Sequence, residues 1–248
     1  MAEPAIRFSK VSKHFGKAHI LRNVDFEVRT GASFALAGEN GAGKTTLIKC
    51  LLDFCHFGAG SILLNGAPVQ LPQSRASVAF LPERFTPPWF LTGREFLSGM
   101  QRLGAGIWDE AHARALLTEL GLAQEALDKP VRTFSKGMSQ KLGLAACFLS
   151  GRKLLVLDEP MTGLDPSARF RVKAILHRLQ GEGCTLLLTS HSLADVEEIC
   201  DHMAVLHRGE VAFTGGPGAL RERYGESSLE RAFLACIGEG VHDREAHG

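Results

Sequence analysis

The segment GENGAGKT, from Gly38 to Thr45, has the residue types and spacing of a phosphate-binding loop, G-x-x-x-x-G-K-[ST]. Its glycines let the backbone curve around a phosphate without Cβ clashes, so that successive N–H groups point at the anion. A helix predicted to begin near Lys44 adds the partial positive charge of its N-terminus. Lys44 can reach the β- and γ-phosphates, and the Thr45 hydroxyl can bind Mg²⁺. The residues predicted to bind the nucleotide here are Asn40, Gly41, Ala42, Gly43, Lys44, Thr45 and Thr46.

A second pattern, KLLVLDEP, ends in two adjacent carboxylates, Asp158 and Glu159. The apolar run 154–157 before them indicates a buried strand, and open α/β sheets bind ligands at the carboxyl ends of their strands. We expect Asp158 to hold Mg²⁺ and Glu159 to act as general base for an attacking water. The alternatives are an ordinary β-turn-α loop at GENGAGKT and a simple turn cap before Pro160.

Strands and helices alternate around these motifs. The predicted strands are AIRF, VDFEV, SFALA (33–37), SILLNG, VAFLP (78–82), KLLVLD, TLLLTS and the two strands of MAVLHRGEVAF. The predicted helices are 44–54, a helical stretch within 92–124, 135–149, ARFRVKAILHRLQ and LADVEEIC. This alternation predicts a parallel sheet covered on both faces. The fold class is therefore α/β, a P-loop NTPase core with a mostly parallel sheet, an N-terminal antiparallel β layer and an inserted helical subdomain.

The predicted domain limits follow from the same pattern. The nucleotide-binding core with its antiparallel layer comprises 1–82 and 151–237, and the helical subdomain comprises 83–150. Hairpins near both ends of the chain, the second turning at Arg208-Gly209, predict the added antiparallel layer. The tail 238–248 is predicted to be disordered.

Composition narrows the function classes. The 248 residues carry 28 basic and 27 acidic side chains, a net charge of +1 without a block of like charge, so no nucleic-acid partner is expected. Six scattered cysteines fit a reducing compartment. Cys50, Cys55 and His56 are close enough to suggest a metal site, but no second half of such a site follows. The sequence shows no signal peptide and no apolar run near the roughly 20 residues needed to span a bilayer.

Together these motifs resemble those of the ATP-binding cassette (ABC) ATPases, the nucleotide-binding subunits of ABC transporters, over almost the whole chain. GENGAGKT resembles their Walker A motif, LLVLDEP their Walker B motif and GLDP (163–166) their D-loop. FSKGMSQ, from Phe134 to Gln140, resembles their signature segment, which other P-loop proteins lack. His191 matches their switch histidine.

The resemblance implies that two subunits pack head to tail around two MgATP. Ser135 and Gly137 would then contact the ATP held by the other subunit, and Asp165 would couple the two sites. The same resemblance implies that His191 contacts the γ-phosphate and positions the water for Glu159, and that Phe15 stacks on adenine. As a lone aromatic residue, Phe15 could equally belong to the core.

Three residues depart from the commonest pattern of the family. Lys136 replaces a usual glycine, Met138 a usual glutamine, and Glu83 the glutamine that contacts Mg²⁺ and senses the membrane partner. Glutamate also binds Mg²⁺ through oxygen, so Glu83 joins Thr45 and Asp158 as a predicted metal ligand. These departures resemble a subgroup that serves exporters.

The aromatic residues that follow Glu83 suggest a second role for this loop. They are Phe85, Trp89 and Phe90. They could line a groove for a cytoplasmic helix of a membrane subunit, or pack against helices of their own subdomain.

The sequence therefore predicts an ATP-hydrolysing subunit of an ABC transporter, most simply an exporter, with ATP and Mg²⁺ as cofactors. Its expected partners are a separate multi-span membrane permease and a second ATPase subunit, identical or similar. Its expected location is the cytoplasmic face of the cell membrane. Two alternatives remain: a soluble ABC ATPase outside transport, which would show a long coiled coil or a second cassette, and a kinase or GTPase, against which FSKGMSQ and the lack of N-K-x-D argue.

Overall fold

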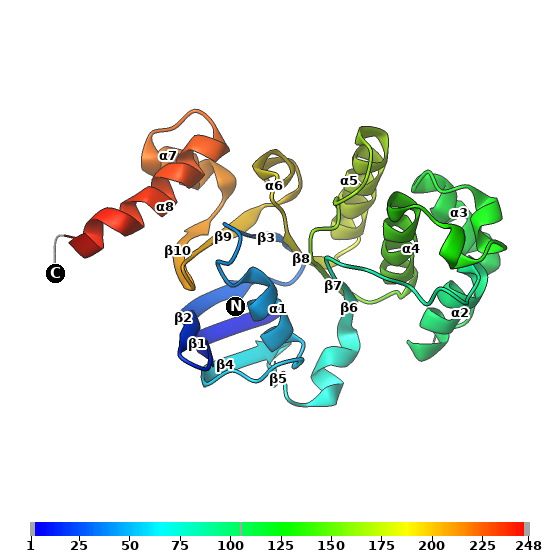
Figure 1. Cartoon of the computed structure of the whole chain (residues 1–248), viewed down its shortest axis with the longest axis horizontal. Coiled ribbons are helices and arrows are strands. Elements are labelled where there is room, and N and C mark those ends of the chain that lie inside the picture. The colour runs from blue at the N-terminus through cyan, green and yellow to red at the C-terminus, as the bar shows by residue number, and fades with distance from the viewer. Residues whose placement is uncertain (1–2, 105, 246–248) are drawn as a thin grey trace.

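A six-stranded sheet forms the centre of the computed structural model, which describes residues 3–104 and 106–245 (Figure 1). Its strands, in spatial order, are β10 (Glu210–Gly215), β9 (His202–His207), β3 (Ser33–Gly38), β8 (Thr185–Thr189), β7 (Leu154–Leu157) and β6 (Val78–Leu81). The strands from β9 to β6 are parallel, and β10 is antiparallel to β9. Strands β3, β7 and β8 are buried throughout, because both faces of the sheet are covered. The prediction of a mostly parallel sheet is confirmed.

A second, four-stranded sheet is antiparallel and forms the predicted N-terminal layer. Its strands, in spatial order, are β2 (Ala18–Val28), β1 (Ile6–Phe15), β4 (Ala59–Leu64) and β5 (Ala67–Pro68). Exposed and buried residues alternate toward the end of β2, since one face of this sheet packs on the core. Leu47 and Ile48 of helix α1 (Lys44–Leu51) share a hydrophobic cluster with both sheets.

The C-terminal hairpin does not belong to this antiparallel layer, so that part of the prediction is wrong. Strand β9 instead pairs with β3 in parallel, with Phe34 opposite His202. The physical reason is the central run of β9, which is buried on both faces and therefore needs a place inside a covered sheet. Hydrophobicity that does not alternate distinguishes this hairpin from the N-terminal one.

Eight α-helices and three short 3₁₀ segments are described in residues 3–104 and 106–245. The α-helices are α1 (Lys44–Leu51), α2 (Gly93–Leu103), α3 (Glu110–Glu119), α4 (Lys136–Leu149), α5 (Pro166–Gly181), α6 (Leu193–Ile199), α7 (Pro217–Tyr224) and α8 (Leu229–Glu245). The 3₁₀ segments are η1 (Pro72–Ser77), η2 (Gln124–Leu127) and η3 (Val131–Thr133). Helix α4 begins at Lys136, one residue after the predicted start at Ser135, and α1 ends three residues before the predicted Phe54.

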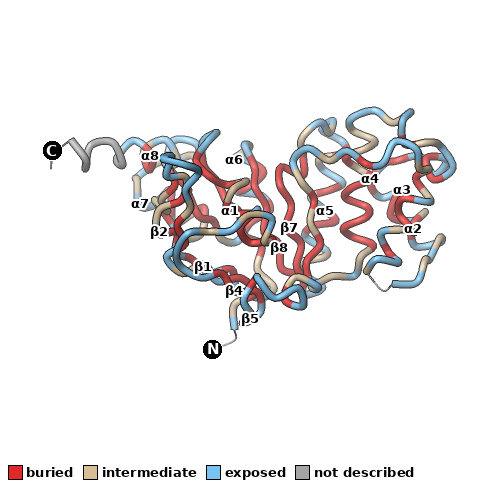
Figure 2. Tube along the Cα trace, turned by 60° about the horizontal axis from the view of Figure 1, so that its bottom comes forward, coloured by how far each residue is buried: buried red, intermediate tan, exposed pale blue. Residues whose placement is uncertain are grey.

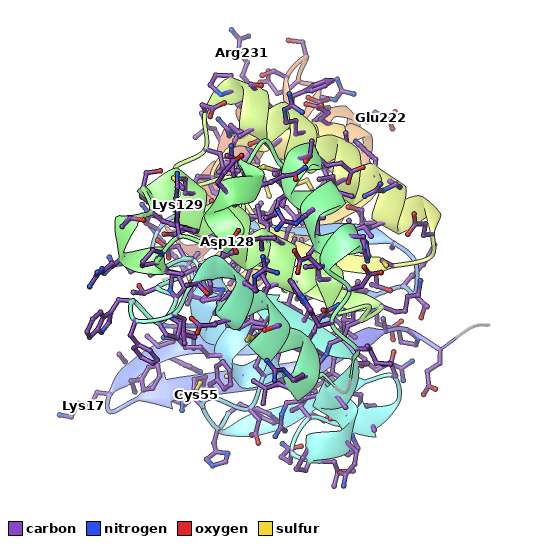
Figure 3. The ribbon with its side chains drawn as sticks, turned by 90° about the vertical axis from the view of Figure 1, so that its right-hand side faces the viewer. Lys17, Cys55, Asp128, Lys129, Glu222 and Arg231 are labelled. Atoms are coloured by element: carbon purple, nitrogen blue, oxygen red, sulfur yellow. The ribbon has the colours of Figure 1, made fainter. Side chains whose placement is uncertain are left out.

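Helices α2, α3 and α4 stand together at one end of the molecule, opposite α7 and α8 (Figure 1). The Arg94 guanidinium, on α2, binds Asp128 at 2.7 Å and also pairs with Glu110 on α3. Figure 3 shows Asp128 on the face that these helices present. Buried residues continue from the helices into the central strands, where Figure 2 shows them concentrated, so the group shares one core with the main sheet. The limits 83–150 for a separate subdomain stay a prediction.

Helix α8 extends into the tail that the sequence predicts to be disordered. Leu229, Ala232, Cys236 and Ile237 are buried at helical spacing, which fixes the start of the helix against the body. The helix continues to Glu245, and the disorder expected for the tail 238–248 stays a prediction. Residues 246–248 lie outside the described part of the chain.

Candidate nucleotide and metal site

The glycine-rich loop joins β3 to α1 in a conformation that its glycines make possible. Gly41 and Gly43 have φ values of 81° and 109°, which other residues adopt only with strain. A Cβ atom on Gly43 would lie 2.8 Å from Cδ2 of Leu21, so a side chain there would also clash. Gly43 is the N-cap of α1 and supplies no side-chain hydrogen bond. The first N–H groups of α1 therefore have no side-chain cap and can bind an anion.

The Lys44 ammonium lies inside this loop. It donates to the carbonyl oxygens of Gly38 at 2.6 Å and Glu39 at 3.1 Å, and the residue is buried. Burial lowers the pKa of Lys44, while the carboxylates of Glu159 and Asp158 oppose that shift. An ammonium has three donors, so one donor remains for a phosphate oxygen.

Asp158 lies at the carboxyl end of β7, where two hydroxyls fix its carboxylate. Thr189 donates to Oδ1 at 2.7 Å, and Thr45 donates to Oδ2 at 3.3 Å. Burial raises the pKa of Asp158 above its ordinary value, and the hydrogen bond from Thr189 opposes the shift. A carboxylate beside a threonine hydroxyl is the oxygen set that Mg²⁺ uses together with nucleotide phosphates.

The backbone of Glu159 adopts a left-handed conformation, with φ of 54°, which is unusual for a residue other than glycine. Its N–H donates to the Thr189 hydroxyl at 2.8 Å, and its Oε2 accepts the His191 N–H at 3.3 Å. Its other oxygen, Oε1, lies 3.4 Å from Nε2 of His191 and is buried without a hydrogen bond to the described residues. Burial raises the pKa of Glu159, and His191 opposes the shift. This geometry leaves one carboxylate oxygen able to accept a proton.

One cavity of about 350 Å³ brings most of the predicted site together. It is lined by Ile20, Glu39, Asn40, Gly41, Gly43, Lys44, Thr45, Thr46, Glu83, Asp158, Glu159 and His191. Ala42 is absent from the lining; it is buried and belongs to the hydrophobic cluster that Leu47 and Ile48 share. Phe15 is also outside the lining; its ring is 53% exposed and lies under the Lys13 ammonium at 4.5 Å.

The predicted signature residues lie outside this cavity. Ser135 is exposed and caps α4, accepting the Met138 N–H at 3.2 Å. Gly137 approaches the D-loop so closely that a Cβ atom there would lie 3.1 Å from the Gly163 carbonyl oxygen. Asp165 is exposed and caps α5 through the Ala168 N–H, which lowers its pKa.

Sequence reasoning missed two residues that organise the site. Thr189 joins the two acids, since its hydroxyl donates to Asp158 and accepts from the Glu159 N–H. Gln140, buried on α4, donates to the Pro160 carbonyl oxygen at 3.0 Å and so ties the signature helix to the chain after Glu159. The signal for Thr189 is a polar residue at the carboxyl end of a buried strand.

The described residues contain neither a further metal-binding cluster nor a candidate membrane-spanning helix. No group of three or more His, Cys, Asp or Glu side chains there could hold a metal ion, which excludes such a site at Cys50, Cys55 and His56. The roles of Thr45, Asp158 and Glu83 as ligands of Mg²⁺ stay predictions, and all three residues line the cavity. Within 3–104 and 106–245, no helix combines the length and hydrophobicity that crossing a membrane requires.

Comparisons with known proteins agree with this geometry. The family profile described as ABC transporter matches residues 21–162. An uncharacterized ABC transporter ATP-binding protein of Synechocystis sp. is 41% identical over 80% of this chain, which spans only 57% of that protein. The Nod factor export ATP-binding protein I of Burkholderia orbicola is 37% identical over 90% of this chain and 74% of its own length.

A solved structure shows the same fold. It is titled as the ATP binding subunit of an ABC transporter, with a TM-score of 0.87 and 30% identity over 94% of this chain and 99% of the other. The profile match and the identity to these relatives agree with the cavity and its motifs. The chain therefore belongs to the ABC transporter ATP-binding family.

Proposed function

We propose that this chain is the ATP-binding and ATP-hydrolysing subunit of an exporter, which pairs head to tail with a second ATPase subunit and drives a separate membrane subunit. The observation that carries the proposal is the single cavity in which Lys44, the Thr45–Asp158 pair and Glu159 converge. In this proposal Lys44 is the cation that binds phosphate, Thr45 and Asp158 are the metal ligands, and Glu159 is the base.

The residues divide the work of hydrolysis among them. The N–H groups at the start of α1 and the Lys44 ammonium bind the β- and γ-phosphates. Thr45 and Asp158 would hold Mg²⁺, which would supply charge neutralisation of the phosphates, and Glu83 lies close enough to line the same cavity. The free Oε1 of Glu159 accepts the proton of the attacking water, and His191 holds that carboxylate and orients the water.

A second subunit completes the site in this proposal. Ser135 and Gly137 lie outside the cavity of their own chain, while the surface around Ser135 is exposed. Pairing two chains head to tail would place each Ser135 hydroxyl and each α4 N-terminus against the γ-phosphate held by the partner. Asp165, also exposed, would lie at the same contact.

The loop after Glu83 supports a membrane partner. Trp89 and Phe90 are 66% and 68% exposed, with ring centroids 5.9 Å apart. Phe85 instead packs against Phe96 at 5.7 Å and lines an apolar groove of about 230 Å³ beside β6 and α2. We propose that a cytoplasmic helix of the permease docks here, which would hold the chain at the cytoplasmic face of the membrane. The direction of transport rests on the similarity to a protein named for Nod factor export.

The direct test is binding and hydrolysis of ATP by the purified chain. Lys44→Ala should abolish binding of a fluorescent ATP analogue, because it removes the buried cation of the loop. Lys49→Ala, on the exposed side of the same helix, is the matched control and should bind like the wild type. Equal binding by both variants would refute the assignment of this cavity.

A further inference from the structure

Two thiols meet at the C-terminal end of α1, away from the cavity lining. The Sγ atoms of Cys50 and Cys55 are 3.5 Å apart. Cys50 is fully buried, whereas Cys55 is partly exposed. Figure 3 labels Cys55 low in the view, beside the antiparallel sheet, with Lys17 on the same side. All six cysteines are thiols, and the function proposed above uses none of them.

The backbone at the end of α1 holds these thiols together. Asp53 adopts a left-handed conformation with φ of 58°. Its N–H donates to the Cys50 carbonyl at 3.1 Å, and the Phe54 N–H donates to the Lys49 carbonyl at 2.8 Å. These two bonds form a Schellman motif, which turns the chain back over the last turn of the helix. Residue 55 is therefore brought against residue 50 by hydrogen bonds of the main chain.

We propose that Cys50 and Cys55 are a redox-sensitive modification site, which a small-molecule disulfide of the glutathione type converts to a disulfide, and that this weakens nucleotide binding. A disulfide has an S–S distance of about 2.05 Å, so the sulfurs must approach by roughly 1.5 Å. The effect on nucleotide binding rests on the proposed function, whereas the disulfide itself does not.

The exchange proceeds in two balanced steps. The partly exposed Cys55 reacts first: its thiolate attacks one sulfur of the reagent, the reagent's S–S bond breaks, and one small thiolate leaves. Cys50 then gives its proton to water and attacks Sγ of Cys55, and the second small thiolate leaves. Two electrons pass from the cysteine pair to the reagent. Burial raises the pKa of Cys50 to about 12, which disfavours the thiolate that the second step uses.

A short chain of contacts connects this pair to Phe15, the predicted adenine contact outside the cavity lining. His56 follows Cys55, and its carbonyl oxygen accepts a hydrogen bond from the Lys13 ammonium at 2.5 Å. That ammonium lies 4.5 Å from the ring centroid of Phe15, the residue predicted to contact adenine. A disulfide that draws Cys55 toward Cys50 therefore moves His56, and with it Lys13. An exposed cation–π contact is worth about two- to fivefold in affinity.

The first experiment detects the bond. The reduced full-length chain is incubated with glutathione disulfide, alkylated and digested with trypsin, which releases Cys50 and Cys55 on one peptide because cleavage follows Lys49. We expect this peptide to lose two hydrogen atoms and to resist alkylation. A glutathione adduct that persists on Cys55, or prior oxidation of the buried Cys147 or Cys200, would overturn the proposal.

The second experiment measures the effect on the site with a fluorescent ADP analogue. Oxidation should raise Kd about two- to fivefold in the wild type, reversibly with dithiothreitol. It should leave Cys55→Ser unchanged, while the control Cys184→Ala should respond like the wild type. Equal affinity of oxidised and reduced wild type would overturn the coupling. A reduced wild type that binds no nucleotide would refute the proposed function and this coupling together, and the mass measurement would still decide the disulfide.

Discussion

The nucleotide cavity and the exposed surface around Ser135 and Trp89 differ in how their side chains are held. In the cavity, Lys44, Asp158 and Glu159 are buried, and each side chain forms a hydrogen bond with another residue of the same chain. On the surface, Ser135 bonds only within its own helix start, and the Trp89 side chain is mostly exposed. The difference indicates that the cavity is organised within one chain, whereas the exposed surface is available to the partner chains that we propose.

The largest effect should come from the cavity. Glu159→Gln keeps the shape of the side chain but removes the proton acceptor, so hydrolysis should fall by about 10²–10⁴-fold while nucleotide binding persists. Phosphate release under excess MgATP measures this. Glu125→Gln, an exposed substitution, serves as control. Turnover of Glu159→Gln near the wild-type rate would remove Glu159 as the base.

On the surface, Trp89→Ala should weaken assembly with the membrane subunit. Loss of a central aromatic anchor typically costs about 2 kcal/mol, roughly thirtyfold in affinity. Because Trp89 is 66% exposed, the melting temperature of the isolated chain should barely change. Phe85→Ala, which removes a packed ring, should instead destabilise the fold by up to about 3 kcal/mol. Pull-down of the permease together with thermal melts separates the two effects, and a large loss of stability in Trp89→Ala would discard the docking surface.

A smaller effect should come from Thr189, the link between the two acids. Thr189→Val removes a hydroxyl but preserves size, so it leaves Oδ1 of Asp158 and the N–H of Glu159 without that partner. We expect the free energy of unfolding to fall by about 1–3 kcal/mol, measured by urea denaturation. An unchanged free energy of unfolding would contradict this prediction, because it would mean that the two hydrogen bonds of the Thr189 hydroxyl do not stabilise the site.

The smallest effect is a pH dependence of stability. Burial raises the folded-state pKa of Glu159, so the folded chain binds more protons than the unfolded chain between the two pKa values. Its contribution to stability is present below the unfolded value of about 4.3 and is lost as pH rises through the folded value. Glu159→Gln should therefore be more stable than the wild type near neutral pH, and the difference should shrink in acid. Parallel stability curves for the two proteins would contradict the raised pKa.

Much of the cavity could be predicted because its residues follow contiguous patterns. A buried strand, a glycine loop and a helix start determine where Lys44 and Thr45 lie, and LLVLDEP does the same for Asp158. Thr189 and Gln140 could not be assigned in this way, because their roles depend on contacts 31 and 20 positions away in the sequence.

The errors in the fold have a similar origin. The turn at Arg208-Gly209 predicts a hairpin but not which strands it joins, and the continuous apolar run of β9 is the local sign that this hairpin belongs to the covered sheet. The packing of two aromatic residues in one loop could not be predicted from the sequence either. Phe85 packs against Phe96, whereas Trp89, four residues later, is exposed.

The proposed dimer is tested most directly by asking whether Ser135 contacts the nucleotide that the partner subunit binds. In the Glu159→Gln background, MgATP should convert the monomer to a dimer in size-exclusion chromatography with light scattering. Adding Ser135→Arg should prevent that dimer while the monomer still binds the fluorescent ATP analogue, and Ser227→Arg, an exposed control, should leave the dimer intact. Loss of nucleotide binding by the Ser135→Arg monomer, or a dimer of normal affinity, would contradict a site completed by a second subunit.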